Sequence, residues 1–220
     1  MTKQNPSRKP ARSTEDKKRQ FQKIIEEGRK LFVSRGTHGF NTRALAKRVN
    51  MSQGNLYNYI QSKRELWIAI RHDDIKKFKE DMEHIIDEYK GSYISLFEKL
   101  LNFYLDFAKD EYRRFQMMFL IPAPSSKKVG PIELSYEVID PIDTIKRVVK
   151  EAIDLGEIKN CDVNNFSYYL YALAQGAFFV EQDLRSHQKI YEPIEIPRKQ
   201  NSIENFRKFL IKKIIEAIKP

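Results

Sequence analysis

The chain has 220 residues, 41% of them hydrophobic, so it can bury a core and is not a disordered polycation despite 40 Lys and Arg against 30 Asp and Glu. Its single cysteine, Cys161, excludes an intrachain disulfide and suits a reducing compartment, so we expect a cytoplasmic protein. No apolar run approaches the roughly 18 residues of a membrane span, and the first residues lack the apolar core of a secretory signal.

The excess positive charge lies in the first third of the chain. Residues 1–70 contain 16 Lys and Arg and 5 Asp and Glu, a net charge of +11, whereas the remaining residues have a net charge of −1. This distribution favours a polyanion-binding head joined to a neutral body. A solvated face with a basic tail explains it equally well, because charge alone does not specify a partner.

Residues 1–12 contain Pro6, Pro10 and four basic residues without apolar periodicity, and we expect a flexible basic arm there. Apolar residues then recur at three- and four-residue steps, which predicts a helix over 16–35 that ends near Gly36.

A short second helix is predicted over 42–49, with Asn41 as its cap. Asn50 tolerates the left-handed backbone of a tight turn, and Ser52 can cap a third helix that continues through Ile60. Leu56 and Ile60 are expected to face inward.

Ser62 and Glu65 form a predicted capping box, in which the side chain of each residue accepts a hydrogen bond from the backbone amide of the other. A long helix is predicted to follow, as far as Tyr89. Beyond Gly91 every periodic stretch is helical, and no strand alternation or internal repeat is evident, so the predicted fold is all-α. The later helices are predicted around residues 94–104, 112–119, 134–156 with a bend at Pro141, 163–188 and 202–219.

Three short helices with a tight turn between the second and third describe a helix-turn-helix, whose third helix enters the major groove of DNA. Gln53 and Asn55 begin that helix, where their amides can pair with adenine, and Gly54 leaves room for the approach. Arg43 can contact guanine. The remaining candidate contacts are Ser52 and four side chains suited to phosphate, which are Thr42, Tyr57, Tyr59 and Lys63. The free amides at the start of the helix after Ser62 can also bind an anion.

Residues 39–66 resemble the DNA-binding signature of the tetracycline-repressor (TetR) family. The shared positions are Leu45-Ala46, Ser52, Leu56-Tyr57, Ser62-Lys63 and Glu65-Leu66. Asn50 replaces the usual turn glycine and Met51 replaces a smaller aliphatic residue, and both keep the physical requirement of their positions. The resemblance implies phosphate contacts by Thr42, Tyr57 and Lys63 and base contacts by Arg43, Gln53 and Asn55.

The resemblance also implies a division into a helix-turn-helix domain at 13–62 and a helical effector-binding and dimerisation domain at 63–220. Members of the family dimerise through their last two helices, so we expect a homodimer. By the same resemblance, the homodimer is expected to bind a palindromic operator and to repress transcription. One helix-turn-helix contacts too few bases for specificity, which independently favours paired half-sites.

A small-molecule effector pocket is implied between the middle helices, which are rich in aromatic residues. Their aromatic residues suit a lipophilic, aromatic or drug-like effector, with fatty acyl-CoA as one option, in which case Arg113 is a candidate for the phosphates. Core packing explains most of the same aromatic residues. The candidate pocket residues are Phe97, Tyr104, Phe107, Arg113, Phe115, Phe119, Tyr169 and Leu173.

Other functions find less support in the sequence. The four histidines form no metal-binding spacing, Cys161 lacks the flanks of a catalytic nucleophile, and no phosphate-binding glycine loop occurs, so we expect no enzyme, metal or cofactor. A basic helical protein that binds anionic membranes or another protein is the alternative. The polar, capped turn at 50–53 has no purpose in such a protein.

Overall fold

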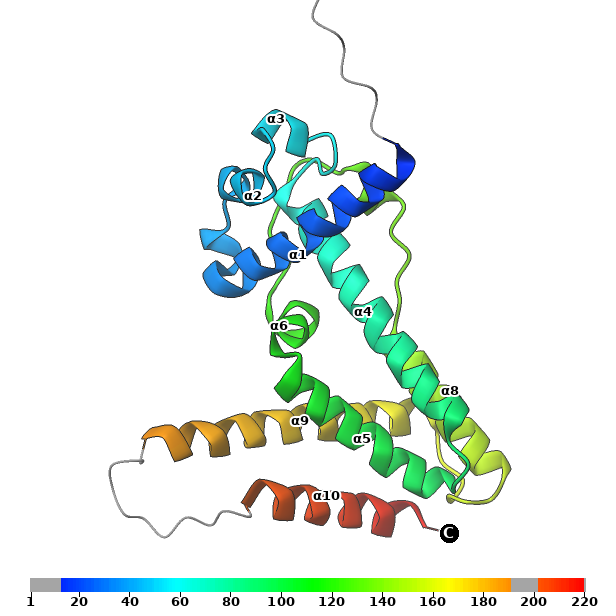
Figure 1. Ribbon diagram of the computed structural model, residues 1–220. Coiled ribbons are helices and arrows are strands. Elements are labelled where there is room, and N and C mark those ends of the chain that lie inside the picture. The colour runs from blue at the N-terminus through cyan, green and yellow to red at the C-terminus, as the bar shows by residue number, and fades with distance from the viewer. Residues whose placement is uncertain (1–12, 191–201, 220) are drawn as a thin grey trace, which may run out of the picture. The chain divides into compact units, whose positions relative to one another are not determined.

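The structure, a computed structural model, describes residues 13–190 and 202–219 (Figure 1). The described residues form helices and no strand, so the predicted all-α fold is confirmed. The predicted arm at residues 1–12 lies outside the described residues. The helices are α1 (Thr14–Gly39), α2 (Thr42–Arg48), α3 (Gln53–Leu56), α4 (Lys63–Glu88), α5 (Tyr93–Asp110), α6 (Tyr112–Phe115), the π-helical turn η1 (Gln116–Leu120), α7 (Pro131–Leu134), α8 (Pro141–Asp154), α9 (Val163–Ile190) and α10 (Ser202–Ile218).

The chain forms two compact units, each built from two separate stretches of the sequence. The first contains the chain up to Asp74 together with Gln116–Glu137, and the second contains Ile75–Phe115 and the chain from Val138 onward. The first unit therefore includes a segment that follows α5 and α6 of the second unit. The predicted functional division between residues 62 and 63 stays a prediction.

The helix starts of the first unit follow their capping residues. Asn41 accepts a hydrogen bond from the Arg43 amide (2.8 Å), and Ser52 accepts one from the Asn55 amide (3.1 Å), as predicted. Asn50 has a φ of 53°, which confirms the left-handed turn between α2 and α3. In α1 the helical conformation is interrupted at Gly36, where φ is 64°.

The third helix is shorter than predicted. It ends at Leu56 instead of continuing through Ile60, because the amides of Tyr59 and Ile60 both donate to the Leu56 carbonyl and tighten the chain into a turn. Leu56 and Ile60 are nonetheless fully buried, as expected.

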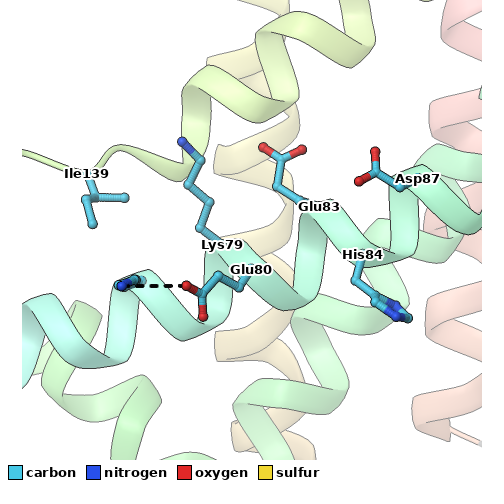
Figure 2. A pocket seen from close by; sticks show the side chains of 7 residues that line it. Lys79, Glu80, Glu83, His84, Asp87 and Ile139 are labelled. Carbon is cyan, nitrogen blue, oxygen red and sulfur yellow. Dashed lines mark ion pairs between the residues drawn. The ribbon is translucent and has the colours of Figure 1, made fainter.

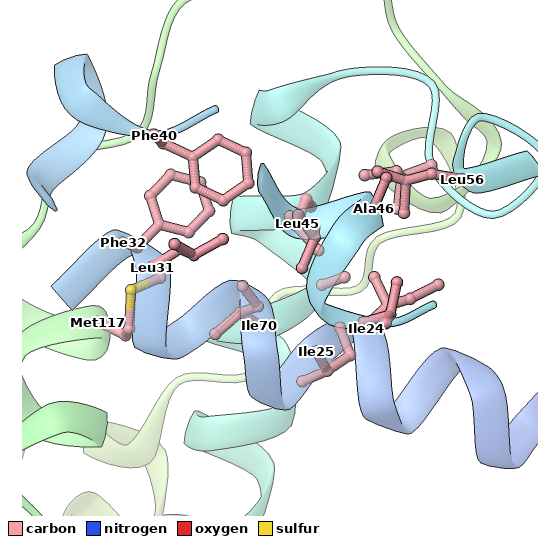
Figure 3. Close-up of a cluster of buried hydrophobic side chains, with 14 residues drawn as sticks. Ile24, Ile25, Leu31, Phe32, Phe40, Leu45, Ala46, Leu56, Ile70 and Met117 are labelled. Carbon is pink, nitrogen blue, oxygen red and sulfur yellow. The ribbon is translucent and has the colours of Figure 1, made fainter. Parts of the chain in front are cut away.

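The core of the first unit joins α1, α2 and α3 to α4 and η1 (Figure 3). Phe32 stacks on Phe40 with ring centroids 4.2 Å apart, and Met117 of η1 is fully buried in the same cluster. The other members shown by label in Figure 3 are Ile24, Ile25, Leu31, Leu45, Ala46, Leu56 and Ile70. The core of the first unit is thus completed by a residue that lies far along the chain.

The start of α4 is held by a buried carboxylate. The Glu65 amide donates to Ser62 Oγ (3.0 Å), which confirms one half of the predicted capping box. The Glu65 side chain, fully buried, accepts from the Gln61 amide and also from the Ile132 amide at the start of α7 (2.8 Å). One carboxylate therefore caps α4 and holds α7.

Further side chains of α4 hold the same segment. Arg64 pairs with Glu133 (2.6 Å). Trp67 Nε1 donates to the Ile121 carbonyl (3.1 Å). Arg71 Nε donates to the Met118 carbonyl (3.2 Å). These bonds fix residues 118–133 along the first half of α4.

In the second unit, α9 packs against α5, α8 and α10 (Figure 1). The predicted bend at Pro141 is wrong: Pro141 is the first residue of α8, and Asp140 caps it by accepting from the Ile142 amide (3.0 Å). Proline fits the first helical turn, where its missing amide has no partner to lose. The preceding apolar residues Leu134 and Val138 lie outside α8 and are 78% and 80% exposed.

Gly130→Ala tests the Glu65 carboxylate contact. A Cβ on Gly130 would overlap the Glu65 carboxylate, which cannot move without breaking its bonds to Gln61 and Ile132. We expect the free energy of unfolding to fall by about 1–3 kcal/mol, as in other overpacked interiors. Chemical denaturation of the full chain measures it.

Gly54→Ala is the matched control in the same unit. Nothing lies within 4 Å of its added Cβ, so its stability should equal or exceed that of the unsubstituted chain. Equal stability of the two variants would contradict the described role of Glu65.

Candidate functional site

The starts of α2 and α3 meet on the surface of the first unit. Gln53, the first residue of α3, donates from Nε2 to Oγ1 of Thr42, the first residue of α2 (3.0 Å). Both side chains are half-buried. Arg43, next to Thr42, is exposed. The structure thus places three of the predicted DNA contacts side by side.

The rest of α3 continues this polar surface. Ser52 and Gly54 are exposed, and Asn55 is half-buried. No atom lies within 4 Å of a Cβ built on Gly54, so the space expected there is present. Asn55 Oδ1 accepts a hydrogen bond from Asn58 Nδ2 (3.3 Å), which adds a third amide side chain, beside those of Gln53 and Asn55, that the sequence analysis did not include.

Lys63 lies at the start of α4, with Nζ 5.6 Å from the centre of the Phe40 ring. Burial lowers the pKa of Lys63. Tyr57 is 40% exposed and Tyr59 is half-buried against the core of the first unit. All nine predicted DNA contacts therefore belong to one unit, within residues 42–63.

Basic side chains border this surface. Lys47 and Arg48 are exposed in the last turn of α2. Arg48 pairs with Glu27 at 3.4 Å, and Glu27 also pairs with Lys30 at 2.7 Å. The hydrogen bond from Lys30 outweighs burial and lowers the pKa of Glu27, so the carboxylate stays ionised and partly neutralises these bases.

The predicted effector residues are only partly brought together. Phe107 packs edge-on against Phe78 at 4.9 Å, and Tyr104 lies 5.6 Å from Phe115, which contacts Phe178 at 4.3 Å. These rings belong to the second unit and are buried. Burial also raises the pKa of the Tyr104 hydroxyl.

The other five effector candidates differ in burial, and one of them belongs to the other unit. Phe97 is buried in α5 and Leu173 is half-buried in α9, whereas Arg113 is exposed and Tyr169 is 45% exposed. Phe119 is part of the first unit. The structure leaves the effector assignment of all eight residues a prediction.

A shallow surface pocket lies along the second half of α4 (Figure 2). Its lining is charged, with Lys76 and Glu80 paired at 3.8 Å, and Ile139 is its single apolar member. Glu83 is already bound by Thr144 (2.7 Å) and Arg147. This pocket does not have the apolar lining expected for a lipophilic effector.

Neither a metal-binding cluster nor a helix able to cross a membrane is present in the part of the chain that the structure describes. No group of three or more His, Cys, Asp and Glu side chains there could hold a metal ion. Among the described helices, none combines the length and apolar character that a membrane crossing requires.

The sequence analysis missed the contribution of residues 116–137 to this unit. Met117, Gly130 and Ile132 have no local pattern that places them against α1 or α4. Only the tertiary structure shows that residues 116–137, far along the sequence, pack beneath the unit that carries the surface at 42–63.

Known proteins share both the amino-terminal sequence pattern and the fold of this chain. Residues 24–70 match the model of the bacterial regulatory proteins of the tetR family. A comparison with curated protein sequences gives no match.

Solved structures share the fold over most of the chain. A candidate tetR family transcription regulator from Shewanella sp. PV-4 has 17% identity and a TM-score of 0.63, covering 91% of this chain and 98% of its own. FadR from Bacillus subtilis, in complex with stearoyl-CoA, has 14% identity and a TM-score of 0.62, covering 89% and 97%.

AibR, solved in complex with isovaleryl coenzyme A and operator DNA, has 14% identity and a TM-score of 0.56, covering 91% of this chain and 98% of its own. At these identities the likeness concerns the fold. Residues 24–70 thus match the amino-terminal region of the tetR family of bacterial regulatory proteins, and the chain as a whole shares the fold of a solved tetR family regulator.

Proposed function

We propose that the protein is a sequence-specific DNA-binding transcriptional regulator that acts as a homodimeric repressor and is released from a palindromic operator by a small lipophilic effector. The observation that carries the proposal is the meeting of the α2 and α3 starts. There Gln53, Thr42 and exposed Arg43 lie together on a helix-turn-helix. AibR, which shares the fold, was solved with operator DNA.

Roles on DNA follow from the chemistry of each side chain. Gln53 and Asn55 carry both a donor and an acceptor, which adenine requires in the major groove, and Arg43 matches guanine. Thr42, Tyr57, Tyr59 and Lys63 supply hydroxyl or ammonium donors for phosphates. The net charge of +11 over residues 1–70 attracts DNA without regard to sequence.

The homodimer is proposed from the surface of α9 and α10. Phe179 and Phe209 are 57% and 59% exposed, and Tyr168, Tyr169 and Val180 are also exposed. Large apolar side chains gathered on two helices favour burial against another protein surface. A second copy of the chain is the simplest partner, because paired half-sites need two heads.

Effector binding is proposed for the aromatic cluster of the second unit. The neighbours FadR and AibR were solved with stearoyl-CoA and isovaleryl coenzyme A, respectively. In this chain Phe115 and its ring neighbours pack closely, so an acyl chain that enters the cluster must displace some of them.

Displacement of Phe115 offers a route to the DNA-binding unit. Phe115 is fully buried in the second unit, and Met117, two residues later, is fully buried in the core of the first. An effector that moves Phe115 therefore strains the attachment of Met117. We expect the paired heads then to lose their match to successive major grooves about 34 Å apart.

Lys63→Ala and Arg43→Ala test the DNA-binding proposal. Lys63→Ala removes a phosphate contact, so it should weaken binding to all sequences alike and reduce the salt slope by about 1. Arg43→Ala should relax specificity at one base pair. Fluorescence anisotropy with selected and random duplexes at several salt concentrations measures both effects.

Anionic liposomes serve as the control ligand in the same series. Equal losses on selected and random DNA for both variants, with liposome binding retained, would contradict the assignment and favour the membrane-binding alternative.

Phe179→Glu tests the homodimer. A charge at this exposed apolar position should convert the dimer to a monomer, because an unpaired carboxylate cannot be buried in an apolar interface. Leu155→Glu, at an apolar position of the same unit that is 67% exposed, should leave the dimer intact. Light scattering after size exclusion decides it, and a monomeric unsubstituted protein would refute the proposal.

Palmitoyl-CoA and free palmitate test the effector class. If an acyl-CoA binds with its phosphates at Arg113, Arg113→Ala should weaken palmitoyl-CoA binding several-fold and leave palmitate binding unchanged. Calorimetric titration measures both affinities. If Arg113→Ala binds both ligands as tightly as the unsubstituted protein does, Arg113 is not part of the site. If the unsubstituted protein does not bind palmitoyl-CoA, long-chain acyl-CoA is excluded as the effector.

A further inference from the structure

We propose that Thr42 determines base specificity by positioning the side chain of Gln53, in addition to any phosphate contact of its own. The proposal rests on the DNA-binding function proposed above and deepens it. Its structural basis is the hydrogen bond from Gln53 Nε2 to Thr42 Oγ1, 3.0 Å long, which joins the first residues of α2 and α3.

The backbone on both sides of this bond is fixed. Asn41 holds the start of α2 through the Arg43 amide, and Ser52 holds the start of α3 through the Asn55 amide. Below them, Leu45 and Leu56 are fully buried in one core. The distance between the Thr42 and Gln53 backbones is therefore set by the fold, and the Gln53 side chain meets a partner at a fixed place.

The hydrogen-bonding capacity of the two groups fits a relay. A threonine hydroxyl has one hydrogen to donate and can accept two bonds. Because Thr42 accepts from Gln53, its own hydrogen stays available for a DNA phosphate. Gln53 uses one of its two amide hydrogens on Thr42, which leaves one N–H and the Oε1 acceptor, the pair that adenine binds in the major groove.

Positioning has a physical consequence for specificity. An unattached glutamine side chain loses rotamer freedom when it binds a base, whereas one held by Thr42 has already lost part of it. Hydrogen bonds in a chain also polarise one another, so a phosphate bound by the Thr42 hydroxyl strengthens the bond that orients Gln53. A backbone contact and a base contact thus become coupled.

The experiment determines base preferences and affinities of the full-length protein by selection from randomised duplex DNA. Thr42→Val keeps the shape of the side chain and removes the hydroxyl, and it should lower the preference at the base pair bound by Gln53 about 2- to 10-fold, the worth of one hydrogen bond. Thr42→Ser, which keeps the hydroxyl, should restore the preference. Gln53→Ala identifies the affected base pair.

Tyr57→Phe is the matched control, because it removes one predicted phosphate-binding hydroxyl without touching Gln53. It should lower the affinity for every sequence and leave the base preferences unchanged. A preference profile of Thr42→Val that equals that of Tyr57→Phe, or a failure of Thr42→Ser to restore it, would overturn the positioning role. Absence of any selected motif for the unsubstituted protein would instead refute the proposed function.

The bond is also measurable without DNA, which covers the case in which Thr42→Val folds poorly. In nuclear magnetic resonance spectra the Gln53 side-chain amide, assigned from its loss in Gln53→Ala, should exchange slowly with solvent in the unsubstituted protein and in Thr42→Ser. Exchange at the rate of a free glutamine amide in both proteins would overturn the proposal.

Discussion

A single buried carboxylate connects the start of α4 to a segment that lies far along the chain. Glu65 accepts one hydrogen bond from an amide four residues before it and another from an amide 67 residues after it. A buried carboxylate is stable only when its oxygens are satisfied, so both amides must stay in place. The start of α4, where Lys63 lies, is therefore held by residues that the chain reaches only after crossing the second unit.

The structural unit that contains the helix-turn-helix is therefore larger than the segment that the family model matches. The matched family segment ends at residue 70, yet the core beneath it contains Met117 and its surface contacts include Arg64 with Glu133. Any event in the second unit that displaces residues 116–137 removes packing and hydrogen bonds from the first. An effector acts through this segment only if it binds two states of the protein with different affinity.

Local patterns in the sequence predict most of the geometry of the helix-turn-helix. Asn41 and Ser52 each cap a helix through an amide two or three residues further along the chain, as predicted. The left-handed conformation predicted for Asn50 is also confirmed. The Glu65 half of the predicted capping box differs in the structure, because the carboxylate accepts from the Gln61 amide in place of the Ser62 amide and also from the Ile132 amide of a distant segment. Pro141 was assigned a bend because apolar residues continue before it, but Leu134 and Val138 proved exposed. The effector region remained least defined, because aromatic side chains that pack a core and those that bind a ligand have the same spacing.

Selection of bound fragments from random and source-genome DNA at physiological salt shows whether two copies of this surface recognise a DNA sequence together. We expect an inverted repeat whose half-sites lie one or more helical turns apart, about 34 Å for one turn. Weak binding without a shared motif would contradict it. In that case residues 42–63 would form a basic surface without sequence recognition.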